Sequence, residues 1–162
     1  MVRNTLHDLE SKIQYSDAAY HLLLMTAAHE SAGLKYDRQI KGPALSYFQI
    51  EPATHVDVFV SYLKYRRELC ELVLDGIPLS SMRWVGRQLV PLDEYLVENP
   101  WYACKIARLV YFRVPQPLPK YDDENVLQSL VGLSYYAKKH YNTVEGKATA
   151  GKYLADYKMY FM

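Results

Sequence analysis

The sequence has few cysteines and no excess of charge of either sign. Its 162 residues include two cysteines, Cys70 and Cys104, which form no CxxC pair, so the sequence predicts neither a zinc ribbon nor a disulfide framework. The formal net charge is +1, and the basic residues are scattered among acidic ones, which excludes the basic stripe that binds nucleic acid. We expect two buried thiols, with a single bridge between them left open, and no nucleic-acid partner.

Long apolar runs are also missing. The longest, residues 18–28, is interrupted by His21 and is too short to cross a bilayer, so no membrane span is expected. Residues 1–14 carry charged side chains where a secretory signal needs an apolar run. We therefore expect no export signal.

What the sequence does contain is a large share of apolar and tyrosine side chains. Half of the residues are hydrophobic and 23% are charged, which predicts one globular domain over residues 1–162. Each of the 16 tyrosines offers an apolar ring and a hydroxyl, which suits a buried helix face as well as a wet cleft. Composition alone therefore indicates no sugar site.

Helical periodicity dominates the chain, and few segments alternate as strands do, so we predict a mostly α fold. Helix start and stop signals predict helices over residues 4–14, 16–33, 52–74, 99–114, 122–141 and 149–160. Residues 34–50 lack that periodicity and contain Gly42-Pro43, which predicts an irregular loop with short β pairing. Residues 83–89 have no clear pattern.

One carboxylate stands out on the helix expected over residues 16–33. Ala19, Leu23 and Ala27 are spaced by four residues and Glu30 follows three later, so all four share one apolar face. Burial would raise the pKa of that carboxyl group and keep it protonated near neutral pH, as a general acid requires. Glu30 is therefore a candidate acid. The alternative is a solvated glutamate at a frayed helix end.

Residues 28–54 read AHESAGLKYDRQIKGPALSYFQIEPAT. This block resembles the lytic transglycosylases of the soluble-lysozyme superfamily (SLT), including those carried by phages. Their pattern is Glu-Ser at a helix end, a loop with Gly-Ala, and then Gln, an apolar residue, any residue, Pro, and a small residue before Thr. The matching positions are Glu30-Ser31, Gly42 with Ala44, Gln49-Ile50 and Pro52-Ala53-Thr54. Later in the chain, Asn99-Pro100 and Tyr141-Asn142 resemble the Asp-Pro and Tyr-Asn pairs of the family.

Four features depart from that pattern. Ser46 stands where the family usually has glycine, and His140 stands where it usually has alanine before Tyr-Asn. The stretch 57–98 is longer than its counterpart, so we interpret it as an inserted helical region. The usual Ala-Gly-Pro is missing after Tyr141-Asn142, so Tyr135 or Tyr136 on the same helix is an alternative to Tyr141.

The resemblance implies a single lysozyme-like domain of the goose type that cleaves the MurNAc-GlcNAc β-1,4 bond of peptidoglycan glycan strands. Glu30 would protonate the leaving oxygen and then, as the conjugate base, take a proton from a hydroxyl of the muramic acid, giving a 1,6-anhydro end. This scheme needs no metal or organic cofactor. The expected substrate-binding residues are Ser31, Ser46, Tyr47, Gln49, Tyr135, Tyr141 and Asn142.

Two other functions stay open. A hydrolase, acting on peptidoglycan as a lysozyme does or on related chitin-like polymers, would need a second carboxylate opposite Glu30. Asp37 and Glu51 are near in sequence, but we interpret both as surface residues. A noncatalytic protein could keep the same fold as a structural or glycan-binding part of a phage particle. The short chain favours a phage origin, with location in the virion or in the host cytoplasm before release, action in the bacterial cell wall, and other virion proteins as further partners.

Zinc-protease chemistry is excluded by the sequence. His29-Glu30 is not followed by a second histidine at helical spacing, so the HExxH motif is absent. His21 and His29 are eight positions apart, too far for adjacent ligands. We interpret both histidines as residues of the helix surface, and we expect no metal.

Overall fold

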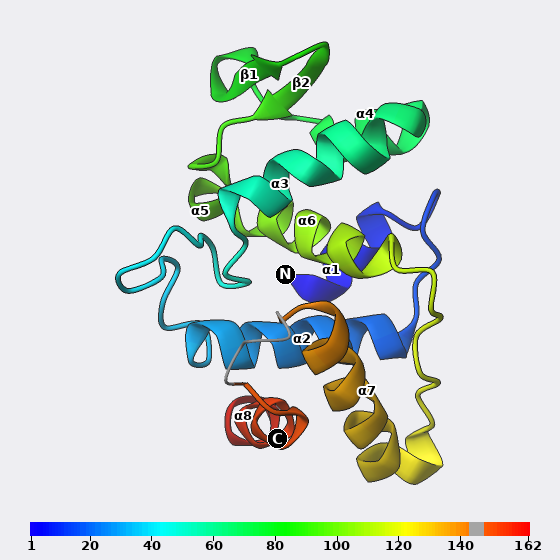
Figure 1. The fold of residues 1–162 in the computed structure, drawn as a ribbon. Coiled ribbons are helices and arrows are strands. Elements are labelled where there is room, and N and C mark those ends of the chain that lie inside the picture. The colour runs from blue at the N-terminus through cyan, green and yellow to red at the C-terminus, as the bar shows by residue number, and fades with distance from the viewer. Residues whose placement is uncertain (143–147) are drawn as a thin grey trace.

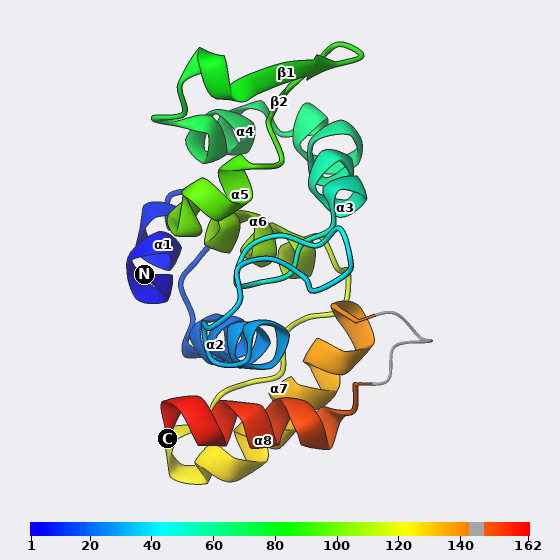
Figure 2. The same cartoon turned by 90° about the vertical axis from the view of Figure 1, so that its left-hand side faces the viewer.

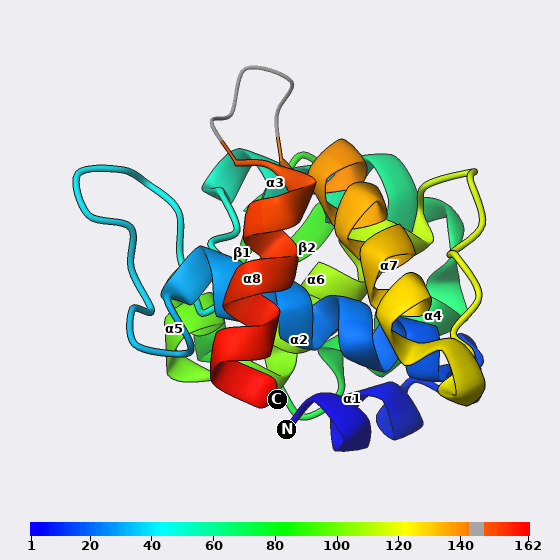
Figure 3. The same cartoon turned by 90° about the horizontal axis from the view of Figure 1, so that it is seen from below.

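The computed structural model describes residues 1–142 and 148–162. Helix α2 (Asp17–Ser31) crosses the middle of the molecule, and both α7 (Val126–His140) and α8 (Ala150–Phe161) pack against it, as Figure 1 and Figure 2 show. Figure 3, in which the molecule is seen from below, shows α8 lying across α2. The described chain is mostly helical, so the expected α class is confirmed.

Two further helices pack above α2. Helix α6 (Pro100–Phe112) contacts α2, and α1 (Val2–Asp8) packs against both of them. Helix α1 is shorter than expected, because the chain turns after it through bonds such as Ile13 N to Leu9 O at 2.8 Å. The side chains of Leu9 and Ile13 are both buried. The turns therefore bring these side chains into the core, whereas a straight helix would have continued past the core.

The starts of α2, α6 and α8 were predicted well because they depend on local chemistry, whereas α1 begins at Val2, before the expected start at residue 4, without a side-chain cap. Ser16 accepts a hydrogen bond from Ala19 N at 3.2 Å, and Asn99 accepts one from Tyr102 N at 3.0 Å. Thr149 caps α8 in the same way, through Lys152 N at 3.1 Å. Each side chain satisfies an amide at a helix start that has no partner within the helix.

The expected helix over residues 52–74 is broken. Helix α3 (Pro52–Asp57) continues through a π-helical turn, η1 (Val58–Tyr62), and a 3₁₀ turn, η2 (Leu63–Tyr65), before α4 (Arg67–Leu74) begins. At the break, Arg66 has φ −134° and ψ 68°, which lie outside the helical region. The apolar pattern thus describes two helices that meet at an angle.

The stretch 57–98, which we interpreted as an inserted helical region, contains a β hairpin as well as helices. After a 3₁₀ turn, η3 (Leu79–Ser81), strands β1 (Met82–Val85) and β2 (Gln88–Pro91) pair antiparallel, with Val85 opposite Gln88, and α5 (Tyr95–Glu98) follows. Gly86 opens the two-residue turn with φ 60°, which glycine adopts at no steric cost. The turn reads Gly-Arg, which is a weaker hairpin signal than Asn-Gly or Asp-Gly.

The last connection leads from α6 to α7 through a proline-containing segment. A 3₁₀ turn, η4 (Asp123–Asn125), precedes α7, so the long helix begins at Val126 and not at the expected residue 122. Helix α7 then ends at His140, close to the expected end at Tyr141.

Residues 34–50 form the irregular loop that was expected. Isolated antiparallel bridges join Leu45 to Arg38 and to Ile50, which confirms the short β pairing. Phe48 is fully buried and anchors the loop in the same hydrophobic cluster as the cores of α2, α6, α7 and α8. The loop is therefore a structured part of the protein, held against the helices by its own apolar side chain.

Both thiols are buried and free, as expected. Burial raises the pKa of Cys104 to about 12. No helix in residues 1–142 or 148–162 is long and apolar enough to cross a bilayer.

Candidate active site

A cavity of about 470 Å³ opens where the end of α2 meets the loop over residues 34–50. The helices and the segment after α7 contribute Glu30, Val110, Tyr141 and Asn142. The loop and the start of α3 contribute Tyr36, Arg38, Gln39, Ile40, Ala44, Gln49, Ile50, Glu51 and Thr54. In Figure 2 the loop crosses the face of the molecule between α2 and α3. The cavity volume lies in the range of ligand-binding pockets.

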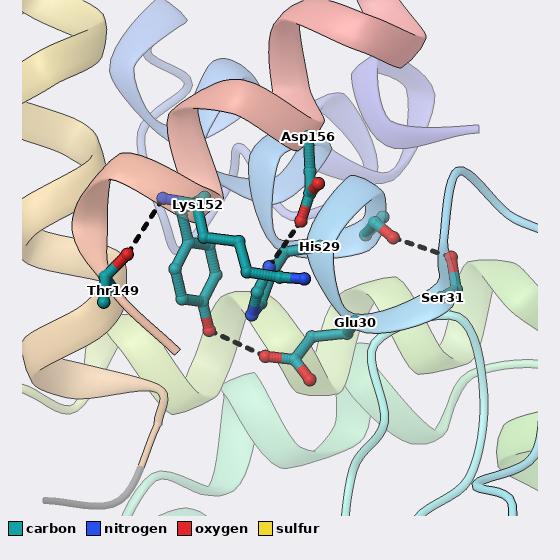
Figure 4. Close-up of polar contacts among 8 residues, drawn as sticks. His29, Glu30, Ser31, Thr149, Lys152 and Asp156 are labelled. Carbon is teal, nitrogen blue, oxygen red and sulfur yellow. Dashed lines mark hydrogen bonds and ion pairs between the residues drawn. The ribbon is translucent and has the colours of Figure 1, made fainter. Parts of the chain in front are cut away.

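Glu30 lies in the last turn of α2 and is half-buried. The hydroxyl of Tyr153 on α8 donates a hydrogen bond to its Oε1 at 2.7 Å, and Figure 4 shows the carboxyl group turned away from the α2 backbone. Burial raises the pKa of Glu30, while the Tyr153 hydrogen bond and the neighbouring His29 act in the opposite direction. Because burial dominates, the carboxyl group keeps its proton to higher pH than an exposed glutamate. This is the property that a general acid needs.

Tyr153 is the site residue that the sequence analysis missed. It is fully buried, and its hydroxyl donates to Glu30. It is 123 positions away from Glu30 in the sequence, and it lies on a helix that showed no chemical motif. No local pattern could have found it.

Tyr141 and Asn142 line the cavity together with Glu30. The hydroxyl of Tyr141 donates to Phe48 O at 2.8 Å, which ties the end of α7 to the loop. Its ring lies 5.1 Å from the ring of Tyr111, between centroids. Of the candidate tyrosines, the structure therefore brings Tyr141 to the cavity.

The other tyrosines expected at the cleft lie elsewhere. Tyr135 is 68% exposed on α7, away from the cavity. Tyr136 is buried, and its hydroxyl donates to Gln116 O at 2.8 Å. Tyr47 is half-buried in the loop but does not line the cavity. The helical period turns the side chains of residues 135 and 136 to faces of α7 that do not line the cavity. Tyr141 follows the end of α7, and that end reaches the loop.

Two expected site residues support the backbone around the cavity. The Oγ of Ser31, which Figure 4 shows in contact with the preceding turn, donates to Ala27 O at 2.6 Å and accepts from Leu34 N at 2.8 Å. Ser31 is fully buried, so it shapes the end of α2 and does not reach the cavity. Gln49 does line the cavity, and its Nε2 donates to Ser46 O at 2.8 Å.

Ser46 is buried and has φ 69°, in the left-handed region that favours glycine. Its Oγ accepts a hydrogen bond from Phe48 N at 3.2 Å, which partly offsets the strain. Ser46 therefore shapes the loop behind the cavity and does not line it.

The strain at Ser46 can be measured with a matched pair of variants. Ser46→Gly and Ser46→Ala both lose the hydroxyl, but only glycine removes the Cβ that disfavours a positive φ. We expect Ser46→Gly to be more stable than Ser46→Ala by about 1 kcal/mol in urea unfolding. A more stable Ser46→Ala would show that the backbone at residue 46 is unstrained, because glycine then only adds entropy to the unfolded chain.

Glu51 is exposed, as expected, but it also lines the cavity. It precedes α3, and its side chain makes no capping hydrogen bond there. Arg38, on the same wall, is paired with Glu94, with Nη2 to Oε2 at 2.6 Å. The interpretation of Glu51 as a plain surface residue was therefore incomplete. Asp37 is exposed and is not part of the cavity wall.

The interpretation of His29 as a helix-surface residue was wrong. Its side chain is 9% exposed, and its Nδ1 pairs with Asp156 Oδ2 at 2.7 Å (Figure 4). His21 is half-buried and makes a hydrogen bond between Nδ1 and the hydroxyl of Tyr157 at 2.6 Å. Both contacts reach α8, which packs over this face of α2 and removes it from solvent.

Within residues 1–142 and 148–162, no group of three or more His, Cys, Asp or Glu side chains is arranged to hold a metal ion. No protein-family model matches the sequence, and neither a curated protein nor a solved structure matches it. The cavity and the residues around Glu30 are therefore the basis for proposing a function.

Proposed function

We propose that this chain is a peptidoglycan lytic transglycosylase with a lysozyme-like fold of the goose type and with Glu30 as its single catalytic acid and base. The observation that carries the proposal is the position of Glu30, a half-buried carboxyl group with a raised pKa at the wall of a cavity. Gln49, Tyr141 and Asn142, which belong to the family-like pattern, line the same cavity. Residues far apart in the sequence thus meet where the proposed chemistry needs them.

The reaction is the one that the resemblance to lytic transglycosylases implies, and it starts from the protonated carboxyl group of Glu30. In the first step the protonated carboxyl group gives its proton to the glycosidic oxygen, and the bond from that oxygen to C1 of the muramic acid breaks. In the second step the O6 hydroxyl of the same sugar attacks C1, and the carboxylate of Glu30 takes the hydroxyl proton. Glu30 is protonated again, and no water is consumed. Gln49 and Asn142 offer amide groups to the sugar substituents.

The proposal is tested by the mass of the products. Wild-type protein is incubated with purified peptidoglycan, and the released muropeptides are analysed by mass spectrometry. We expect 1,6-anhydro ends, which are lighter than hydrolysed ends by one water. Reducing ends would contradict the transglycosylase reaction, and an absence of products would contradict catalysis and favour the structural or glycan-binding alternative.

Hydrolysis is the second candidate, because Glu51 lines the cavity together with Glu30. Most glycosidases use two carboxylates across the scissile bond, and the second either activates water or acts as nucleophile. Within the described residues, the Glu51 side chain has no hydrogen bond or ion pair, so its carboxylate is available to water in the cavity.

A Glu51→Gln variant separates the two reactions. If Glu30 acts alone, the variant keeps its rate within about threefold of wild type, because the amide preserves the shape of the side chain. A loss of about 10²-fold or more, together with reducing ends from wild type, would instead establish a two-carboxylate hydrolase. Glu98→Gln, at an exposed glutamate outside the cavity, is the control for the loss of one negative charge.

A further inference from the structure

Helix α8 contacts α2 at two consecutive residues of the candidate site. The hydroxyl of Tyr153 donates to Glu30 Oε1 at 2.7 Å, and Asp156, three positions later, pairs with His29 at 2.7 Å. The rings of His29 and Tyr153 lie 3.9 Å apart between centroids. Figure 4 shows His29 and Asp156 meeting beside the Glu30 carboxyl group. A shift of α8 along α2 would break both contacts, so the pair His29–Asp156 fixes where Tyr153 stands.

We propose that Tyr153 is a positioning residue that holds Glu30 by Oε1 and leaves Oε2 to exchange the proton with the glycan. The catalytic part of this inference rests on the proposed function, but the hydrogen bond itself does not. Within the described residues, Oε2 has no hydrogen-bond partner. The acid proton therefore resides on Oε2, because Oε1 accepts the hydrogen of the tyrosine hydroxyl.

The hydrogen bond favours the ionised form of Glu30. As the proton leaves, negative charge grows on the carboxylate, and a hydrogen bond to a charged acceptor is stronger than one to a neutral acceptor. Tyr153 thus acts against the effect of burial, which favours the protonated form. The other titratable and charged groups that act on Glu30 or line its cavity are His29, Tyr36, Arg38, Glu51, Tyr111 and Tyr141. The uncharged polar side chains of the cavity wall are Gln39, Gln49, Thr54 and Asn142. They remain in place when only the Tyr153 hydroxyl is removed.

The test is a Tyr153→Phe variant, in which the titration of the Glu30 carboxyl carbon is followed by NMR. We expect the midpoint of this titration to move to higher pH than in wild type, because the ionised form has lost its donor. In the digestion of peptidoglycan we expect kcat to fall about tenfold. We also expect the limb of the pH profile that reports loss of the Glu30 proton to move to higher pH.

Tyr157→Phe is the matched control. Tyr157 lies on the same helix and is also buried, but its hydroxyl contacts His21 and not Glu30. This variant should leave the Glu30 midpoint and kcat unchanged, although it loses a buried hydroxyl in the same helix. An unmoved or lowered midpoint in Tyr153→Phe, or an equal shift in Tyr157→Phe, would overturn the inference whether or not the protein cleaves peptidoglycan. A raised midpoint without any cleavage would support the contact and contradict only the proposed function.

Discussion

Glu30→Gln lowers the rate of glycan cleavage by about 10³-fold, because the amide occupies the same space but has no proton to give to the leaving oxygen. The hydrogen bond from Tyr153 can persist, since the amide oxygen also accepts. The measurement is the release of muropeptides by wild type and variant at equal protein concentration, with Glu98→Gln as the control. Residual activity within tenfold of wild type would show that another group is the acid.

The same substitution changes stability in a pH-dependent way. Because burial raises the pKa of Glu30, the folded chain binds this proton more tightly than the unfolded chain. The resulting stabilisation is fully present below the unfolded-state pKa and is lost as the pH rises through the higher folded-state pKa. Glutamine has no such proton to lose. In urea unfolding at a series of pH values, we therefore expect the stability of Glu30→Gln relative to wild type to rise as the pH passes from the unfolded-state pKa of glutamate to the raised folded-state pKa of Glu30.

Phe48→Ala destabilises the protein by about 3–5 kcal/mol, because it leaves a cavity where a fully buried ring stood. The substitution also loosens the loop over residues 34–50, whose only large buried ring belongs to Phe48. The Phe48 backbone also makes two hydrogen bonds near the site. Phe48 N donates to Ser46 Oγ, and Phe48 O accepts from the hydroxyl of Tyr141. Loosening the loop should therefore raise KM as well.

Urea unfolding measures the loss of stability, and hydrogen exchange of amides in residues 34–50 shows where the structure opens. Phe48→Leu is the matched control, because it keeps most of the apolar volume and should cost less than about 1.5 kcal/mol. A cost below about 1 kcal/mol for Phe48→Ala would mean that the loop is not anchored by this ring.

Much of the helical framework could be predicted because helix starts depend on contacts over three or four residues. Ser16, Asn99 and Thr149 cap their helices through amides three positions later, and Pro52 begins α3. The β hairpin was missed because its Gly-Arg turn is a weak signal. The break at Arg66 was missed because an apolar pattern does not report the angle between successive segments. The sequence pattern of apolar residues on one face is the same for one long helix as for two short helices.

The candidate site was predicted in part, because several of its residues belong to short sequence motifs. Glu30, Gln49, Tyr141 and Asn142 were named from short motifs, and the structure places all four at one cavity. Ser31 and Ser46 were named from the same motifs, but both hydroxyls are used to hold the backbone. A motif contains residues that shape a site as well as residues that line it, and only side-chain directions separate the two.

By itself, the sequence determined the mostly helical class, the starts of the main helices and the carboxylate on the apolar face of α2, all of which follow from spacings of a few residues. Tertiary structure alone decided what surrounds that carboxylate. Tyr153 reaches Glu30 across 123 positions, and Tyr141 reaches Phe48 across 93. Such contacts depend on how whole helices pack, because the burial of their apolar faces, and not any local signal, brings α8 and the end of α7 against α2 and its loop.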